Sequence, residues 1–194
     1  REAGKENSVG SPQPDRATRG KQVLGPDDIA RSLTRIAYEI IERNDGADGL
    51  VIAGIPTRGA TLARRLVERI GQVGGARTQY ASIDTTMFRD DLRAQPIRVL
   101  QPTDIPAGGI DGAVVVLVDD VFYSGRTVRS ALEAIADIGR PAAVQLAVLV
   151  DRGHRELPIR ADYVGKNLPT SRSERVRVAL IPQDGADSVS IEES

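Results

Sequence analysis

Hydrophobic and polar positions alternate along the chain with two different periods. Short apolar runs, which are typical of buried strands, occupy residues 50–55, 79–83, 114–119, 143–150 and 176–181. Apolar residues spaced three or four apart predict helices that begin at Pro26, near Gly59 and at Thr127. Because strands alternate with helices, the pattern predicts an α/β fold with a central, mostly parallel sheet flanked by helices.

Polar segments interrupt this pattern. Residues 1–22 are rich in Gly, Ser, Pro and charge, which predicts a disordered arm before one domain over residues 23–192. Residues 84–96 are charged and poorly periodic, so we expect a long mobile loop, followed by a peripheral ribbon formed by residues 97–100 and the Pro/Gly-rich segment 102–112. Residues 151–175 form a long polar insertion before the last strand.

The composition excludes several kinds of site. Twenty-six basic residues nearly balance 27 acidic ones, so the net charge of -1 predicts neither nucleic-acid nor membrane binding. The chain has no cysteine and one histidine, which excludes disulfides, thiolate sites and multi-histidine sites within it. His154 has no neighbouring nucleophile pattern and is interpreted as structural. No apolar run reaches the ~18 residues of a membrane helix and no signal core opens the sequence, so we expect a cytoplasmic protein.

The strongest chemical signal is the segment from Val115 to Thr127. Its apolar run ends in two adjacent carboxylates, Asp119 and Asp120, and a small turn that starts at Ser124 leads into a helix. Backbone N–H groups and the positive end of the helix dipole favour a phosphate at such a turn. Paired carboxylates can hold sugar hydroxyls or a hydrated Mg²⁺. The segment therefore predicts a site for a sugar phosphate.

The predicted sheet determines where this site lies. In parallel α/β sheets, ligands bind beyond the carboxyl ends of the strands. The loops at 54–59, 84–96, 119–127 and 151–175 start at or near such ends. We therefore expect these loops to converge on one cleft.

Val115 to Thr127 resembles the PRPP-binding signature of type I phosphoribosyltransferases. Further segments resemble one subfamily closely: residues 33–37, 57–59, 88–91 and the long stretch 151–174. Over residues 24–192 the chain is thus similar to the bacterial bifunctional pyrimidine-operon regulators and uracil phosphoribosyltransferases. The resemblance implies a type I phosphoribosyltransferase fold with a flexible catalytic loop and a small hood subdomain, mainly residues 151–176.

The implied reaction joins uracil to the ribose of 5-phosphoribosyl pyrophosphate (PRPP) with Mg²⁺, and yields UMP and pyrophosphate. Such a reaction requires that both partners are held and that the charge on the leaving group is neutralised. The resemblance assigns catalysis to Asp119, Asp120, Arg58 and Arg89, with the two aspartates as candidate Mg²⁺ contacts. The residues expected to contact PRPP or the nucleotide are Thr57, Arg58, Asp119, Asp120, Val121, Phe122, Tyr123, Ser124, Gly125, Arg126, Thr127, Arg152 and Val176.

Tyr123 bears on the choice of base. In superfamily members that act on 6-oxopurines, an acid occupies this position and serves the purine ring. Tyrosine in its place fits a pyrimidine, and residues 151–176 would then lie as a hood over uracil. Arg89 lies on the predicted mobile loop and is expected to close over the pyrophosphate, which would exclude water.

The resemblance also implies a second function, the binding of pyrimidine-operon mRNA in response to uridine nucleotides such as UMP and UTP. The family's RNA-contacting positions correspond to Thr34, Arg35, Tyr38, Arg160 and Lys166. Tyr38 departs from the family, which commonly has histidine there, although tyrosine can stack on an unpaired base. Pro56 likewise replaces a lysine of the first phosphate turn. A homo-oligomer is expected, because the RNA face of one small monomer is narrow.

Two alternatives stay open at the level of the sequence. The chain could act mainly as an RNA-binding regulator that senses UMP or PRPP with weak enzyme activity, or as a phosphoribosyltransferase for another base. Acid pairs at strand ends, arginines in loops and basic helix faces are also common on solvated surfaces. Activity with a panel of bases would separate these hypotheses.

Overall fold

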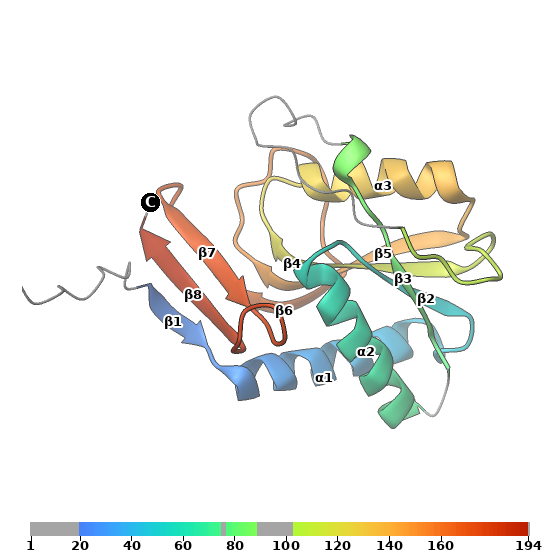
Figure 1. The fold of residues 1–194 in the computed structure, drawn as a ribbon, viewed down its shortest axis with the longest axis horizontal. Coiled ribbons are helices and arrows are strands. Elements are labelled where there is room, and N and C mark those ends of the chain that lie inside the picture. The colour runs from blue at the N-terminus through green and yellow to red at the C-terminus, as the bar shows by residue number, and fades with distance from the viewer. Residues whose placement is uncertain (1–19, 75–76, 89–102, 194) are drawn as a thin grey trace, which may run out of the picture.

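The computed structural model describes residues 20–74, 77–88 and 103–193 (Figure 1). The helices are α1 (Pro26–Arg43), α2 (Arg58–Gly74), α3 (Arg126–Ile138) and the short 3₁₀ helix η1 (Thr86–Phe88). The strands are β1 (Lys21–Leu24), β2 (Leu50–Gly54), β3 (Gln79–Ser82), β4 (Val114–Phe122), β5 (Ala143–Asp151), β6 (Tyr163–Asn167), β7 (Glu174–Ala179) and β8 (Ser188–Glu193). Residues 89–102, which include Arg89, the end of the predicted mobile loop and the first part of the predicted ribbon, lie outside the described residues. The start of that loop contains η1, and within 103–112 Asp104 forms an isolated bridge with Ser82.

Five parallel strands form the main sheet in the order β3-β2-β4-β5-β6. Helices α1 and α2 cover one face and α3 covers the other, so the fold has three layers (Figure 1). Alternate residues of a strand face opposite layers: Val116 and Val118 pack with α1 and α2, whereas Val115 and Leu117 pack with α3. The predicted α/β fold is confirmed, and burial of both faces explains the continuous apolar runs in the sequence.

Local signals set the helix ends. Pro26 occupies the first position of α1, and the Asp28 carboxylate accepts a hydrogen bond from the Gly25 amide at 2.9 Å. This hydrogen bond is the main reason that the pKa of Asp28 lies below its ordinary value. Helix α3 begins after Gly125, whose φ of 95° is left-handed and favours glycine, and it ends before Gly139.

A second, antiparallel sheet with the order β1-β8-β7 lies beside the main sheet (Figure 1, left). Lys21 and Gln22 pair with β8, so β1 includes the last two residues of the expected arm. The hydrophobic pattern of the sequence does not predict β8, because Val189 is the one buried residue of this strand. The first and last strands of the described domain therefore pair with each other in this sheet, and β8 also pairs with β7.

The segment 151–176, expected to form a hood, divides between the two sheets. Tyr163–Asn167 is β6, which pairs with β5 as an edge strand of the main sheet, and Glu174 starts β7 of the small sheet. The expectation of one polar insertion was wrong here because an edge strand buries few side chains. Only Tyr163 and Gly165 of β6 are buried.

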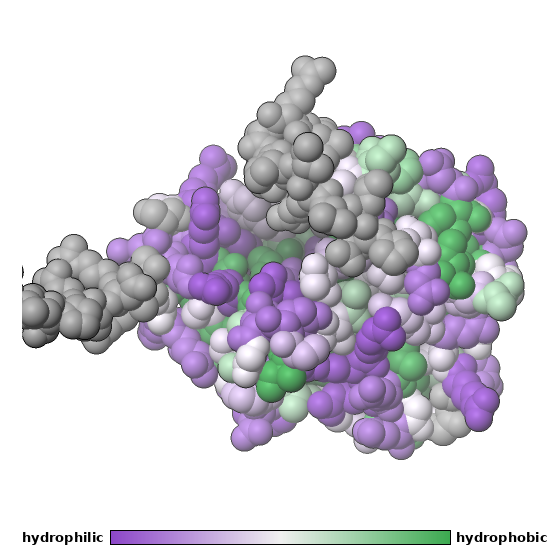
Figure 2. Space-filling view, in the orientation of Figure 1, coloured by the Kyte–Doolittle hydropathy of each residue, from purple (hydrophilic) through white to green (hydrophobic). Residues whose placement is uncertain are grey.

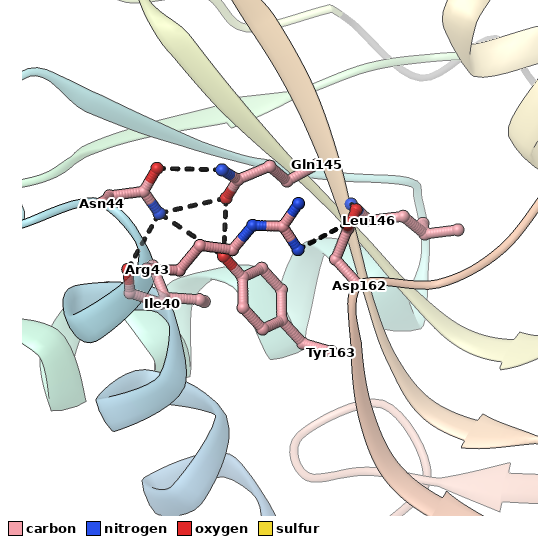
Figure 3. A network of polar contacts seen from close by, with 7 residues as sticks. All are labelled: Ile40, Arg43, Asn44, Gln145, Leu146, Asp162 and Tyr163. Atoms are coloured by element: carbon pink, nitrogen blue, oxygen red, sulfur yellow. Dashed lines mark hydrogen bonds and ion pairs between the residues drawn. The ribbon is translucent and has the colours of Figure 1, made fainter.

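A polar network holds β6 against the end of α1 (Figure 3). The Tyr163 hydroxyl donates to the Gln145 side-chain oxygen at 2.7 Å, and Asn44 and Gln145 exchange hydrogen bonds through their amides. Arg43 pairs with Asp162 at 2.7 Å beside this network. Burial raises the pKa of Tyr163, so the hydroxyl keeps its proton and remains a donor. The network therefore fixes the position of α1 relative to β5 and β6.

The view in Figure 2 shows a mostly hydrophilic face, with hydrophobic residues in small separate patches. Scattered patches of this kind are ordinary on a protein surface. Among the described residues, no helix has the length and apolar character needed to cross a membrane.

Candidate phosphoribosyl-transfer site

The site lies where the strand order of the main sheet reverses. From β2 the chain proceeds through α2 to β3 on one side, and from β4 it proceeds through α3 to β5 on the other. In α/β sheets the loops separate at such a switch point and form the ligand crevice, which places the candidate crevice at the carboxyl ends of these two strands. The Ile55 amide donates to the Val118 carbonyl at 2.9 Å and holds the first loop beside β4.

Gly59 allows α2 to start directly against β4. A Cβ atom at this position would lie 2.5 Å from the Val118 carbonyl oxygen and 3.3 Å from the Asp119 Cα. Any side chain would therefore push the helix start away from the acid pair. This close approach places the first turn of α2 next to Asp119 and Asp120.

The acid pair lies inside β4 rather than after it. Strand β4 continues to Phe122, three residues beyond the predicted end. Asp119 is buried, with an exposed fraction of 7%, and one of its carboxylate oxygens accepts a hydrogen bond from the Asp120 amide at 2.9 Å. Asp120 is half-buried and accepts from the Val121 amide at 2.8 Å. Continued strand pairing with β5 thus holds both carboxylates in place.

The predicted phosphate turn has the expected form. Gly125 precedes α3, and a side chain on it would be strained and would also approach Leu157 to 3.4 Å. The Ser124 carbonyl accepts hydrogen bonds from the amides of Glu156 and Leu157, so the loop between β5 and β6 supports the turn. Thr127 lies in the first turn of α3, whose N–H groups lack partners within the helix. These donors suit a phosphate group.

Arg58 is the first residue of α2 and pairs with a carboxylate from the loop between β7 and β8. Its Nε and Nη2 atoms donate to the two carboxylate oxygens of Asp184, at 3.0 and 2.8 Å. The hydrogen bond to Asp184 raises the pKa of Arg58, and the negative charge of Asp120 contributes in the same direction. Thr57 immediately precedes this helix, in the turn after β2. The arginine is therefore charged and lies within reach of the negative charge of Asp120.

Arg152, Tyr123 and His154 form a cluster at the carboxyl end of β5. The Arg152 guanidinium lies 4.3 Å from the centre of the Tyr123 ring and donates to Thr170 Oγ1 and to the carbonyls of Ser171 and Glu174. His154 contacts the Tyr123 ring edge-on and hydrogen-bonds the Thr170 carbonyl. Arg152 is buried, so it braces the chain that leads into β7, beside the phosphate turn.

Other predicted site residues lie in different surroundings. Phe122 is buried in the core between the sheet and α3, with an exposed fraction of 1%, so its side chain does not line the crevice. Arg126 has an exposed side chain that pairs with Glu156 at 2.7 Å. Val121 and Val176 are half-buried against the core on the α1 and α2 side. Arg89 lies outside the described residues, although Phe88, just before it, is held on α3 by Ser130.

The structure brings four of the five expected RNA-contacting residues to adjoining elements. Thr34, Arg35 and Tyr38 lie on α1, and Arg35 donates to the Val164 and Gly165 carbonyls of β6 at 3.1 and 2.7 Å. Lys166 is exposed on the same strand.

An open groove of about 480 Å³ runs along this face of α1, lined by Ala30, Arg31, Thr34, Arg35, Tyr38, Glu39 and Glu42. The groove carries both signs of charge, because Arg35 pairs with Glu39 at 2.7 Å. Arg160 is exposed in the loop before β6.

The described residues offer no cluster of three or more acidic or histidine side chains that could cage a metal ion. Asp119 and Asp120 supply two carboxylates at the crevice. This donor set fits Mg²⁺, which keeps several waters and takes its other ligands from substrate oxygens. A metal would therefore be held jointly by these aspartates and a bound phosphate compound.

Two residues that contact predicted site residues are missing from the sequence predictions. Asp184 pairs with Arg58 across 126 positions of sequence. Arg155 donates to the Tyr123 carbonyl at 2.7 Å, and its guanidinium lies 3.4 Å from the centre of the Phe122 ring. Arg155 falls within the segment that resembles the family, but the residue type alone indicates no role. Asp184 carries no local signal, because its partner is distant in sequence.

Comparisons with known proteins agree with this geometry. The family model described as "Phosphoribosyl transferase domain" matches residues 21–179. The chain is 62% identical over 177 residues to the "Bifunctional protein PyrR" of Streptomyces coelicolor, covering 91% of this chain and 92% of that protein. It is 59% identical to the PyrR of Mycolicibacterium paratuberculosis, covering 88% and 92%.

Solved structures show the same fold at low identity. The hypoxanthine phosphoribosyltransferase of Staphylococcus aureus aligns with a TM-score of 0.67 at 18% identity, covering 97% of this chain and 98% of that one. The enzyme of Trypanosoma cruzi gives a TM-score of 0.67 at 18% identity, covering 89% and 96%. The chain therefore belongs to the phosphoribosyl transferase domain family and, within it, to the bifunctional PyrR proteins.

Proposed function

We propose that this chain is a uracil phosphoribosyltransferase, which converts uracil and PRPP to UMP and pyrophosphate. The observation that carries the proposal is the meeting of three groups at the sheet's switch point: the Asp119–Asp120 pair, the turn that opens α3, and Arg58. Membership of a phosphoribosyl transferase family supports the reaction type.

In this proposal each group holds one part of PRPP. The aspartates hold the ribose hydroxyls, and the amides from Ser124 to Thr127 hold the 5′-phosphate. Arg58 faces the pyrophosphate, whose negative charge grows as it leaves the sugar, so its attraction to the arginine strengthens in the transition state. Mg²⁺, bound through the aspartates and the substrate, would neutralise further charge on the leaving group. Arg89 remains a candidate for closing the site.

The proposed base is a pyrimidine. Tyr123 is partly exposed at the end of β4, in the position where purine-specific relatives of the superfamily carry an acid. Its ring is backed by Arg152, whose donors are engaged by the chain leading to β7. A tyrosine held in this way can pack against a flat base, but it offers no carboxylate to a purine nitrogen. Backbone groups near Val176 would then read the uracil edge.

A base-panel assay tests this proposal. Product formation from PRPP and Mg²⁺ is measured with uracil, orotate, hypoxanthine and guanine under the same conditions. We expect UMP from uracil and little product from the purines. Turnover of hypoxanthine or orotate without turnover of uracil would overturn the choice of base but leave the phosphoribosyl transfer intact.

A second function, uridine-nucleotide-dependent binding of pyrimidine-operon mRNA, is favoured by the α1–β6 face. Tyr38 is 56% exposed on α1, and Lys166 is exposed on the adjoining strand. An exposed ring and nearby cations suit an unpaired base and its phosphates. The relatives are named as bifunctional, which supports a role besides catalysis. A homo-oligomer would repeat this face and widen it.

Lys166→Ala and Tyr38→Ala test the second function better than Arg35→Ala, because Arg35 also holds β6 through two carbonyls. Affinity for the operon leader RNA is measured with and without UMP over a range of salt concentrations. Arg177→Ala, which removes one exposed charge from β7, is the matched control. Lys166→Ala should lower the slope of log affinity against log salt by about 0.7 to 0.9. Equal effects of Lys166→Ala and Arg177→Ala would contradict a specific RNA face.

A further inference from the structure

The loop between β7 and β8, residues 180–187, lies along the first two turns of α2. It contacts residues 58, 61 and 65, which share one face of the helix because they are three and four positions apart. Gln183 donates to Thr61 Oγ1 at 2.6 Å. Arg65 donates to both carboxylate oxygens of Asp187, at 2.6 and 2.9 Å, and to the Ile181 carbonyl. The C-terminal part of the chain is thus fastened to the helix that starts at the crevice.

Asp184 is the member of this loop that reaches the crevice. It is itself held, because one of its carboxylate oxygens accepts from the Leu180 amide at 2.8 Å and its own amide donates to the Leu180 carbonyl at 2.9 Å. Its side chain is 18% exposed, against 36% for Arg58. Hydrogen bonds from Arg58 and from the Leu180 amide hold the pKa of Asp184 below its ordinary value, so it stays ionised at neutral pH.

The geometry of the pair divides the guanidinium into an occupied edge and a remaining edge. A guanidinium carries five N–H groups in a fixed plane. Asp184 takes one N–H from Nε and one from Nη2, which is a side-on, two-point contact. Three N–H groups are then left for other acceptors, and Asp120 contributes to the electrostatic field at the same arginine.

We propose that Asp184 is a positioning residue, which fixes the plane of the Arg58 guanidinium so that its remaining edge meets the pyrophosphate of PRPP. This inference rests on the proposed phosphoribosyl transfer and assigns a specific task to the loop between β7 and β8. An arginine side chain has several rotatable bonds, and fixing them before the substrate arrives lowers the entropy lost on binding. Asp184 does not touch the substrate; it acts through Arg58.

The variant Asp184→Asn tests the proposal, with Asp187→Asn as the matched control. Both variants replace one carboxylate of the same loop, and each of these carboxylates pairs with an arginine of α2. Arg65, the partner of Asp187, lies seven residues further along α2 from the crevice than Arg58. Asp184→Asn should raise the KM for PRPP and the inhibition constant of pyrophosphate about tenfold, with a smaller change in kcat and none in the KM for uracil. Asp187→Asn should leave the KM for PRPP unchanged.

A double-variant cycle with Arg58→Ala shows whether Asp184 acts through the arginine. In the Arg58→Ala background, Asp184→Asn should cause no further increase in the KM for PRPP, because the group that it orients is gone. Additive effects would overturn the proposal, as would a lower KM in Asp184→Asn, which would mean that the aspartate competes with pyrophosphate. Equal effects of Asp184→Asn and Asp187→Asn would show a structural role only.

Two further measurements keep the outcomes distinct. Calorimetric binding of PRPP and pyrophosphate needs no turnover, so an effect of Asp184→Asn on affinity remains measurable even if uracil is not the base. If Asp184→Asn does not fold, Asp184→Glu retains the charge and displaces the carboxylate by one methylene. A raised KM for PRPP at an unchanged melting temperature is expected for that variant, and an unchanged KM would overturn the proposal.

Discussion

The turns that follow β2 and β4 share a local sequence pattern, but their arginines pair with carboxylates in different surroundings. Each leaves the carboxyl end of a central parallel strand, and each opens a helix whose first residue is an arginine, Arg58 in α2 and Arg126 in α3. Each arginine pairs with a carboxylate from the later part of the chain. Arg58 pairs with Asp184, 126 residues away, and Arg126 pairs with Glu156, 30 residues away.

The two ion pairs differ in burial and in the geometry of their contact. The side chains of Arg126 and Glu156 are 51% and 49% exposed, so water screens their attraction. Those of Arg58 and Asp184 are 36% and 18% exposed and form a two-point contact. The turn after β4 thus presents backbone amides, whereas the turn after β2 presents the Arg58 guanidinium, which Asp184 holds in place. The same local pattern acquires its chemistry from the partner that the fold supplies.

Removing the acid pair at the end of β4 should have the largest effect on activity. The double variant Asp119→Asn, Asp120→Asn should lower kcat/KM by at least about 100-fold, because charge that develops in the transition state loses its partners. The rate of UMP formation is measured, and circular dichroism checks that the fold is kept. A folded double variant with near-normal activity would show that the crevice at β4 is not the reaction site.

Gly59 tests the close approach of the two turns. Gly59→Val introduces atoms where a Cβ alone would lie 2.5 Å from the Val118 carbonyl oxygen, so α2 must move. We expect a loss of unfolding free energy of about 3 kcal/mol, measured by urea titration. Gly74→Ala, at the other end of α2, meets only the flexible side chain of Ile41 and is the control. Similar losses in both variants would show that the crowding at Val118 is relieved elsewhere.

The pair Arg65–Asp187 gives the loop between β7 and β8 a pH-dependent stability. The hydrogen bonds from Arg65 hold the pKa of Asp187 below its ordinary value of 3.8. The pair therefore contributes its full stability above the unfolded pKa and loses it as the pH falls through the lower folded value.

Unfolding free energies of the original chain and of Asp187→Asn, measured from pH 7 to pH 2.5, test this dependence. At pH 7 the original chain should be more stable than Asp187→Asn by about 2 kcal/mol. This difference should shrink below about pH 4, where Asp187 of the original chain takes up a proton. A difference that stays constant down to pH 2.5 would mean that the carboxylate charge does not stabilise the loop.

Glu156→Gln should produce the smallest effect. Its carboxylate pairs with Arg126 at the surface, so its loss should change the unfolding free energy by less than about 1 kcal/mol. Its backbone amide, which donates to the Ser124 carbonyl, is unaffected by the substitution. Activity should stay near the original value. A loss of activity comparable to that of Asp184→Asn would remove the distinction between the two arginines.

Much of the main sheet could be predicted from the sequence, because burial of both strand faces produces continuous apolar runs. Strands β2 to β5 and the three helices follow that signal. Strands β1, β6 and β8 do not, because each buries few residues; β1 and β6 are edge strands, and β8 is the middle strand of the small sheet. The local periodicity of such a strand is therefore weak, and its pairing depends on a partner elsewhere in the chain.

The sequence by itself determined the fold class, the acid pair, the phosphate turn and the family, because each is encoded in consecutive residues. Only the tertiary structure decided which charged side chains lie together at the carboxyl ends of β2 and β4. It paired Arg58 with Asp184 from the far end of the chain, exposed Arg126 and buried Phe122. An ion pair depends on distance in space rather than on separation in sequence, so the chain must fold before these roles exist.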